Sequence, residues 1–213
     1  MTNSRDHILG KLRQGKRPFP AAQLPTQYRR MVPTETEDPA ALKALFVQEA
    51  EKVDCVIHAV ANAEAAIAAI MQVVGMDTAV SCWDLAHIPV PGLEAALAQA
   101  HITRVGQDAN VRVGITGVDA ALAATGSLIL MSGNGRYRAA SLLPPVHIAV
   151  LIESQIIPDL ESWWAQQRAL GLEQTRQASN IAIISGPSRT ADIAMQLVLG
   201  MHGPRELHLV IME

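Results

Sequence analysis

The chain has 213 residues, of which 49% are apolar, 17% charged and only 3% aromatic, and its formal net charge is -3. This length accommodates one large domain with a substantial buried core, and so small a net charge does not indicate a nucleic acid or a membrane as partner. Cys55 and Cys82 alone cannot supply the roughly four close soft ligands of a structural zinc or iron–sulfur centre, so we expect no metal site and no resident cofactor.

The first 37 residues differ in composition from the rest of the chain. Ile8 and Leu12 share one stripe of residues 4–14, which predicts a short amphipathic helix. Prolines at positions 18, 20, 25 and 33 then favour an irregular arm. Seven of the 17 basic residues but only one of the 20 acidic residues lie within the first 30 positions. We therefore expect a basic arm over 1–37, solvated or strapped across a neighbouring subunit rather than bound to RNA or lipid, and an α/β domain over 38–213.

No targeting signal is apparent in the sequence. The first residues, MTNSRDHILG, lack the apolar core of a secretory signal. No stretch reaches the roughly 20 apolar residues of a membrane helix. We therefore expect a cytoplasmic protein without a membrane span.

Helix-like and strand-like segments alternate from residue 38 onwards. Helical periodicity predicts helices over 39–53, 62–74, 91–100, 117–126, 157–171 and 189–200. Compact apolar runs predict strands over 55–60, 78–83, 102–106, 111–116, 127–132, 146–153, 180–185 and 205–212. Strands without clean alternation, separated by helices, favour parallel pairing with both sheet faces covered. We predict an α/β fold with a mostly parallel, Rossmann-like sheet and helices on both faces.

The stretch SGPSRTAD, residues 185–192, concentrates polar groups between a predicted strand and a predicted helix. In open α/β sheets, ligands bind at the carboxyl ends of strands. Ser188 is placed to cap a helix beginning near Arg189, where unpaired amides, the helix dipole and the guanidinium would favour an anion. Gly186, Ser188, Arg189 and Thr190 are therefore candidate ligand-binding residues. The alternative is an ordinary helix start that binds nothing.

Two residues near this stretch are candidate catalytic residues. Asp192 would lie in the first turn of the predicted helix, where it would act as a base, hold Arg189 or stabilise the dipole. His202 occupies a short turn before the last strand, and histidine titrates near neutrality. A hydrogen-bonding bystander is the alternative for His202. Gly203, beside it, is a further candidate ligand-binding residue.

Two loops complete the set of candidates. Thr125 and Gly126 join a predicted helix to a strand and are candidate ligand-binding residues, although a helix C-cap at positive φ also accounts for Gly126. The loop after residue 132 carries Asn134, Arg136 and Arg138, which could close over a ligand. This loop lacks both Walker spacing and the dinucleotide glycine fingerprint, so a nucleotide site is not supported.

Three blocks of sequence carry a family resemblance. They are GITGVDAALAATGSLIL (114–130), SLLPPVHIAVL (141–151), and ISGPSRTADI followed by LVLGMHGPRELHLVI (184–211). On these blocks the chain resembles the LUD-domain family, and within it the lactate utilization protein C branch; the N-terminal half is similar in organisation alone. Ala194 stands where the family often carries an acid, so no catalytic carboxylate is expected at that position.

The resemblance implies a Rossmann-like sheet similar to the CoA-transferase and ribose-phosphate isomerase group. It also implies a role in oxidising L-lactate to pyruvate with partner subunits that carry iron–sulfur clusters. Because no redox carrier is encoded, the chain would be the subunit without such a cluster, holding a small carboxylate, and would not oxidise lactate alone. Two alternatives stay open: a stand-alone transferase, isomerase or ligase acting on a phosphorylated or CoA-linked substrate, and a scaffolding subunit without a ligand.

Overall fold

The computed structural model describes residues 4–15, 34, 36–106, 108, 110–191 and 197–213. The chain divides into two units, Met1–Met31 and Val32–Glu213. In the first unit, helix α1 (Ser4–Gln14) forms over the predicted residues, and the side chains of Ile8 and Leu12 are exposed. Among the described residues, no helix combines the length and the apolar character that crossing a membrane requires.

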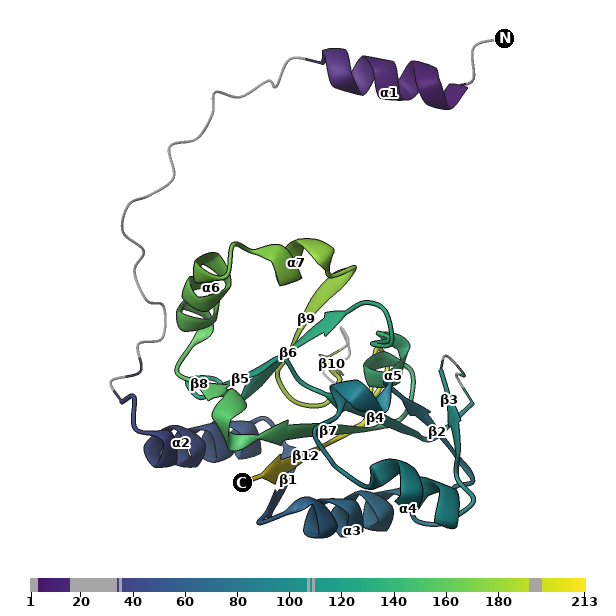
Figure 1. The fold of residues 1–213 in the computed structure, drawn as a ribbon, viewed down its shortest axis with the longest axis vertical. Coiled ribbons are helices and arrows are strands. Elements are labelled where there is room, and N and C mark those ends of the chain that lie inside the picture. Colours follow the sequence, from purple (N-terminus) through teal and green to yellow (C-terminus); the bar gives the residue numbers. More distant parts are fainter. Residues whose placement is uncertain (1–3, 16–33, 35, 107, 109, 192–196) are drawn as a thin grey trace. The chain divides into compact units, whose positions relative to one another are not determined.

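A six-stranded parallel sheet forms the centre of the second unit (Figure 1). Neighbouring strands in it are all parallel. Both faces of its middle strands are covered, which explains why their sequences are apolar throughout rather than alternating. The predicted, mostly parallel α/β fold is thus confirmed. In spatial order the strands are β1 (Cys55–Val60), β12 (Glu206–Met212), β7 (Val146–Ile152), β4 (Val113–Gly117), β2 (Ala79–Cys82) and β3 (Thr103–Val105).

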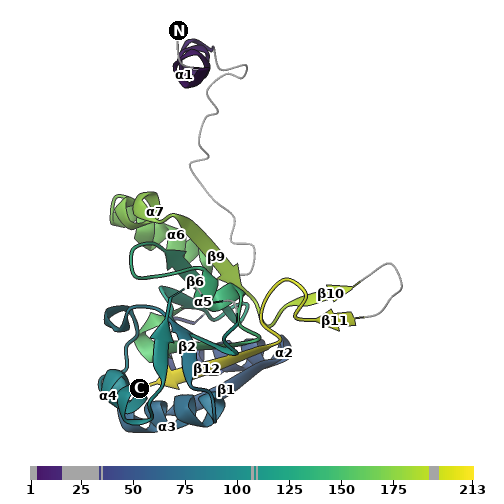
Figure 2. The same cartoon turned by 90° about the vertical axis from the view of Figure 1, so that its right-hand side faces the viewer.

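Helices cover this sheet, three of them at the predicted places and a fourth in a segment for which the sequence predicts a loop. Helix α2 (Pro39–Lys52) begins after Asp38, whose side chain accepts a hydrogen bond from the Ala41 amide at 2.9 Å. Helices α3 (Ala63–Val74) and α4 (Leu93–Gln99) lie together on one side of the sheet in both views (Figures 1 and 2). The short helix α5 (Ala139–Leu142) contacts β4 and β7.

A second sheet was not expected from the sequence, and it corrects one predicted helix. Residues 117–126 form strand β5 and a turn instead of a helix, and β5 pairs antiparallel with the next strand. The alanines that suggested helical periodicity are small and buried, so they let this sheet pack closely into the main core. Its strands, in spatial order, are β8 (Ile156–Ile157), β5 (Ala120–Leu122), β6 (Ser127–Ser132) and β9 (Asn180–Ile184).

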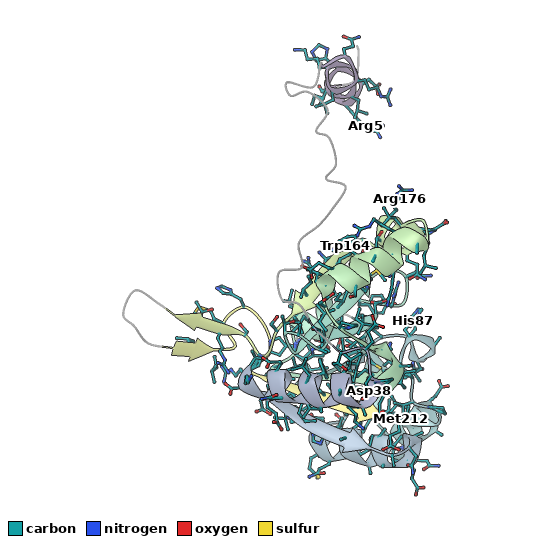
Figure 3. All side chains as sticks on the ribbon, turned by 90° about the vertical axis from the view of Figure 1, so that its left-hand side faces the viewer. Arg5, Asp38, His87, Trp164, Arg176 and Met212 are labelled. Carbon is teal, nitrogen blue, oxygen red and sulfur yellow. The ribbon has the colours of Figure 1, made fainter. Side chains whose placement is uncertain are left out.

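Helix α6 (Leu160–Ala169) covers the outer face of this second sheet. The side chain of Trp163, in this helix, is buried against apolar residues of β5 and β6. Trp164 meets the Trp163 ring edge-on at a centroid distance of 4.7 Å and stays half-buried on the outer side of the helix (Figure 3). The two adjacent tryptophans therefore differ in burial, since one packs in the core and the other remains partly exposed. The short helix α7 (Glu173–Gln177) follows.

The helix predicted over 189–200 is also wrong. Strands β10 (Arg189–Ala191) and β11 (Leu197–Leu199) form an antiparallel hairpin that extends from the rest of the unit (Figure 2). The amide of Gly200 closes the hairpin by donating to the carbonyl of Ser188 at 2.9 Å. Pairing across the hairpin satisfies backbone groups that a helix would otherwise have paired, so the segment forms two strands in spite of the helical spacing of its apolar residues.

Candidate functional site

A cavity of about 630 Å³ lies beside the segment that joins β9 to β10. Strand β9 forms one wall, the 185–190 segment and the turn at 202–204 form a second, and Arg138 with α5 residues forms a third. The structure thus gathers three parts of the chain that are far apart in sequence. Six predicted site residues line this cavity: Gly186, Ser188, Arg189, Thr190, His202 and Gly203.

Ser188 holds the two loops of this cavity together. Its amide donates to the carbonyl of Pro204 at 2.8 Å, and its hydroxyl accepts from the amide of His202 at 3.3 Å. Gly203 packs directly on the Ser188 side chain. Because Ser188 precedes a strand and its amide is already paired, the predicted cradle of unpaired helix amides is wrong. Ser188 joins the two loops by hydrogen bonds and does not cap a helix.

The 185–190 segment also lies at a different end of the main sheet from the one that the sequence predicts. Gly186 has φ +83, and a Cβ there would lie 2.2 Å from the carbonyl oxygen of Val53, just before β1. Burial raises the pKa of the neighbouring Cys55 thiol to about 11, against the opposing hydrogen bond from the Gly186 backbone. The loop follows the carboxyl end of β9, but it lies at the amino end of β1 in the parallel sheet. The predicted carboxyl-end placement therefore holds for the second sheet alone.

Two arginines line the cavity, and they differ in their partners. Arg189 forms an ion pair with Asp54, so its charge is already balanced at the rim. Arg138 is exposed, lines the cavity, and has no carboxylate partner within the described part of the chain. A guanidinium without a partner is the stronger attraction for an anion. Arg138 therefore replaces Arg189 as the main candidate for anion binding.

Hydroxyl groups line the wall next to β9. The Ser185 hydroxyl lies 2.7 Å from that of Ser127, which accepts a hydrogen bond from the Thr125 hydroxyl at 2.9 Å. Ser141, on the α5 side, donates to the carbonyl of Arg138 at 3.1 Å. Thr125 is thus connected to the cavity through two serines, although it does not line the cavity itself. The sequence singled out neither Ser141 nor Ser185 as a ligand-binding residue.

Gly126 has a structural role. It occupies the turn between β5 and β6 at φ +61, and its backbone touches the last turn of α2 near Ala50. The positive φ expected from the sequence is present, but the residue caps no helix. Gly126 is not among the residues that line the cavity.

The structure describes His202, one of the two candidate catalytic residues, but not Asp192, the other. His202 is exposed and lines the cavity, and its backbone is fixed by the Ser188 hydroxyl. Asp192 lies outside the described residues, as does Ala194. His202 is therefore the candidate catalytic residue that the structure places at the cavity wall.

Three further histidines, His58, His147 and His208, lie in strands of the main sheet. His147 is fully buried, its Nε2 lies 2.9 Å from the Thr116 hydroxyl, and burial lowers its pKa to about 3. His58 stacks on His208 with their ring nitrogens 3.0 Å apart, and burial together with the His208 charge lowers the pKa of His58. In the part of the chain that the structure covers, no three histidine, cysteine or acidic side chains form a possible metal site.

Comparison with known proteins adds family evidence to this geometry. The LUD domain model matches residues 43–212. The chain is similar to a lactate utilization protein C of Halalkalibacterium halodurans, with 40% identity over 101 residues that make up 47% of this chain and 44% of that protein. A lactate utilization protein C of a Geobacillus species is 35% identical over 133 residues, 61% of this chain and 52% of that protein. The chain spans about half the length of these curated relatives.

One solved structure shares the fold. It is the crystal structure of a DUF162 family protein from Deinococcus radiodurans, with a TM-score of 0.62 and 22% sequence identity. The match covers 84% of this chain and 100% of that one. At this identity the likeness supports the fold and not a shared activity.

Proposed function

This chain belongs to the LUD domain family, and we propose that it is the subunit without an iron–sulfur cluster in a system that oxidises L-lactate to pyruvate. Its similarity to proteins named lactate utilization protein C supports a role in lactate use. Its two cysteines are both buried, and burial raises the pKa values of Cys55 and Cys82 to about 11 and about 12. Such thiols are poor cluster ligands, so we assign the clusters to partner subunits.

We further propose that the cavity beside Ser188 holds the substrate carboxylate. The observation that carries this proposal is the position of Arg138, which has no carboxylate partner among the described residues and shares the cavity with the hydroxyls of Ser185 and Ser188. Oxidation of lactate releases two electrons and two protons. In this arrangement His202 accepts the hydroxyl proton, and the Cα hydrogen leaves with the two electrons, as a hydride equivalent, to a redox carrier of a partner subunit.

A second candidate function is favoured by the size of the cavity. A volume of about 630 Å³ is far larger than lactate needs and matches a drug-sized ligand. A stand-alone transferase, isomerase or ligase would place a phosphate or a CoA-linked acyl group there, again next to Arg138. The two candidates differ in the ligand that they predict and not in the place where it binds.

Ligand-dependent thermal stability of the purified chain tests the proposal. A saturating small carboxylate, at about 100 times its Kd, stabilises the folded state by about 2.7 kcal/mol, so L-lactate or pyruvate should raise the melting temperature by several degrees. Arg138→Gln should weaken this binding by about tenfold or more, because a charge-assisted hydrogen bond contributes about 1.5–3 kcal/mol.

Arg104→Gln is the matched control, because Arg104 pairs with Glu94 on the surface and does not line the cavity. This variant should respond to lactate as the unmodified chain does. Protection by sugar phosphates or CoA esters, without protection by lactate, would favour the second candidate function. No protection by any of these ligands would favour the scaffolding alternative.

A further inference from the structure

A second cavity, of about 430 Å³, lies at the carboxyl end of the parallel sheet. Asp119 follows the end of β4 by two residues, and His87 belongs to a short 3-10 helix, η1 (Leu85–His87), that follows β2. Figure 3 shows His87 on the side of the unit away from the β10–β11 hairpin. This is the end of an open α/β sheet at which ligands are generally bound. The cavity is lined by His87, Asp119, Gly133, Asn134, Arg136, Gln174 and Gln177.

An ion pair between Asp119 and Arg136 is central to this second cavity. The Arg136 Nη1 donates to Asp119 Oδ1 at 2.8 Å, and the amide of Met131 donates to Oδ2 at 2.5 Å. Burial raises the pKa of Asp119, although the Met131 amide and the Arg136 charge oppose this effect. Because both carboxylate oxygens are engaged, Asp119 acts as a positioning residue that fixes the guanidinium.

The opposite edge of this guanidinium has no partner among the described residues. Nε is buried without a hydrogen bond, and no hydrogen bond is made by Nη2. The Nε and Nη2 hydrogens point in parallel and form the fork that binds both oxygens of a carboxylate. A buried donor without an acceptor is uncommon in native proteins and is relieved when an acceptor binds.

The backbone around Arg136 is held rigidly enough to present this edge. The amides of Gly133 and Arg136 each donate to the carbonyl of the other at 3.1 Å. The indole of Trp83 donates to the carbonyl of Tyr137 at 3.0 Å. Arg136 and Arg138 thus flank a fixed residue, and each lines a different cavity.

We propose that this second cavity binds a small hydroxycarboxylate, with its carboxylate on the Nε–Nη2 edge of Arg136 and its hydroxyl groups on Asn134 and Gln174. Each side chain that lines the cavity carries a polar or charged group, which favours a ligand with a carboxylate and hydroxyl groups. The Gln177 amide already donates to Glu173 at 3.0 Å, which leaves its carbonyl oxygen as an acceptor for a hydroxyl. This site is separate from the one beside Ser188 and does not depend on it.

A titration of the full chain by two-dimensional nitrogen–proton NMR tests the second site. The probe is D-glycerate, and glycerol, which has the same carbon skeleton without the carboxylate, is the control ligand. Glycerate should cause saturable shifts of the Arg136 Nε–H signal and of the Asn134 amide, with at least tenfold weaker effects from glycerol. Shifts confined to the amides of residues 185–203, or equal shifts with glycerol, would overturn the proposal.

Matched variants separate this site from the first one. Arg136→Gln alone would leave Asp119 buried without its partner, so the double variant Asp119→Asn, Arg136→Gln is used to keep the pair neutral. Followed at the Asn134 amide, glycerate should bind this double variant at least tenfold more weakly and should bind Arg104→Gln as tightly as the unmodified chain. An unchanged response of the Asn134 amide in a folded double variant, or its loss in Arg104→Gln, would contradict the second site.

Discussion

Replacing Gly126 with alanine is expected to lower the free energy of unfolding by about 2–5 kcal/mol. The residue has φ +61, where an L side chain costs about 1–2 kcal/mol. An added Cβ would also lie 2.3 Å from the amide nitrogen of Ala50 and 2.5 Å from the carbonyl carbon of Glu49. Both atoms belong to the backbone of α2, so the clash can be relieved only if the helix or the β5–β6 turn moves.

Gly171→Ala provides the matched control for this prediction. Gly171 has φ +74, but a Cβ there would meet nothing within 4 Å, so this variant carries the conformational cost alone. We expect it to lose about 1–2 kcal/mol in urea unfolding followed by tryptophan fluorescence. Equal losses in the two variants would show that the contact between Gly126 and α2 does not determine the stability of this turn.

Stability should also fall as the pH is lowered through the range of histidine titration. Burial lowers the pKa of His147 from 6.5 to about 3, whereas the unfolded chain titrates near the ordinary value. The unfolded state therefore takes up a proton first, and the stabilisation is complete above pH 6.5 and is lost progressively down to about pH 3. Since each pH unit corresponds to about 1.4 kcal/mol, His147 alone should account for a loss of about 2 kcal/mol at pH 5.

His147→Gln isolates this contribution from those of other groups. Glutamine does not titrate and can still bond the Thr116 hydroxyl, which lies 2.9 Å from His147 Nε2 in the native chain. The pKa of His58 is lowered as well, so part of the pH dependence should persist in the variant. Urea unfolding at several pH values between 5 and 7 should give a clearly shallower slope for the variant. The same slope in both proteins would mean that His147 is not the group that titrates.

The parallel sheet was predictable because each of its strands is locally distinct. Buried strands such as 113–117 and 146–152 are apolar without alternation, and capped helices separate several of them. The two wrong helices share one cause. Residues 117–126 and 189–200 carry alanines or apolar residues at helical spacing, but β5 pairs antiparallel with the strand that follows it, and the two ends of 189–200 pair antiparallel with each other. Local periodicity contains no information about such partners.

The sequence predicted which residues line the candidate site better than it predicted how those residues would bind a ligand. The 185–190 segment and the HGP turn were both identified, and the structure brings them together through Ser188. The prediction that a helix dipole attracts the anion is wrong, because the helix expected over residues 189–200 does not form. The serine pair of residues 127 and 185 and the ion pair of residues 119 and 136 connect positions 58 and 17 residues apart. Such contacts arise from the packing of the second sheet, so local sequence patterns do not predict them.

A crystal structure of the chain grown with oxamate, the amide analogue of pyruvate, tests the central claim most directly. We expect the oxamate carboxylate to lie within hydrogen-bonding distance of the Arg138 guanidinium, in the cavity lined by Ser185, Ser188 and His202. Oxamate bound elsewhere, or a cavity that stays empty beside Arg138 at concentrations that stabilise the protein, would contradict it.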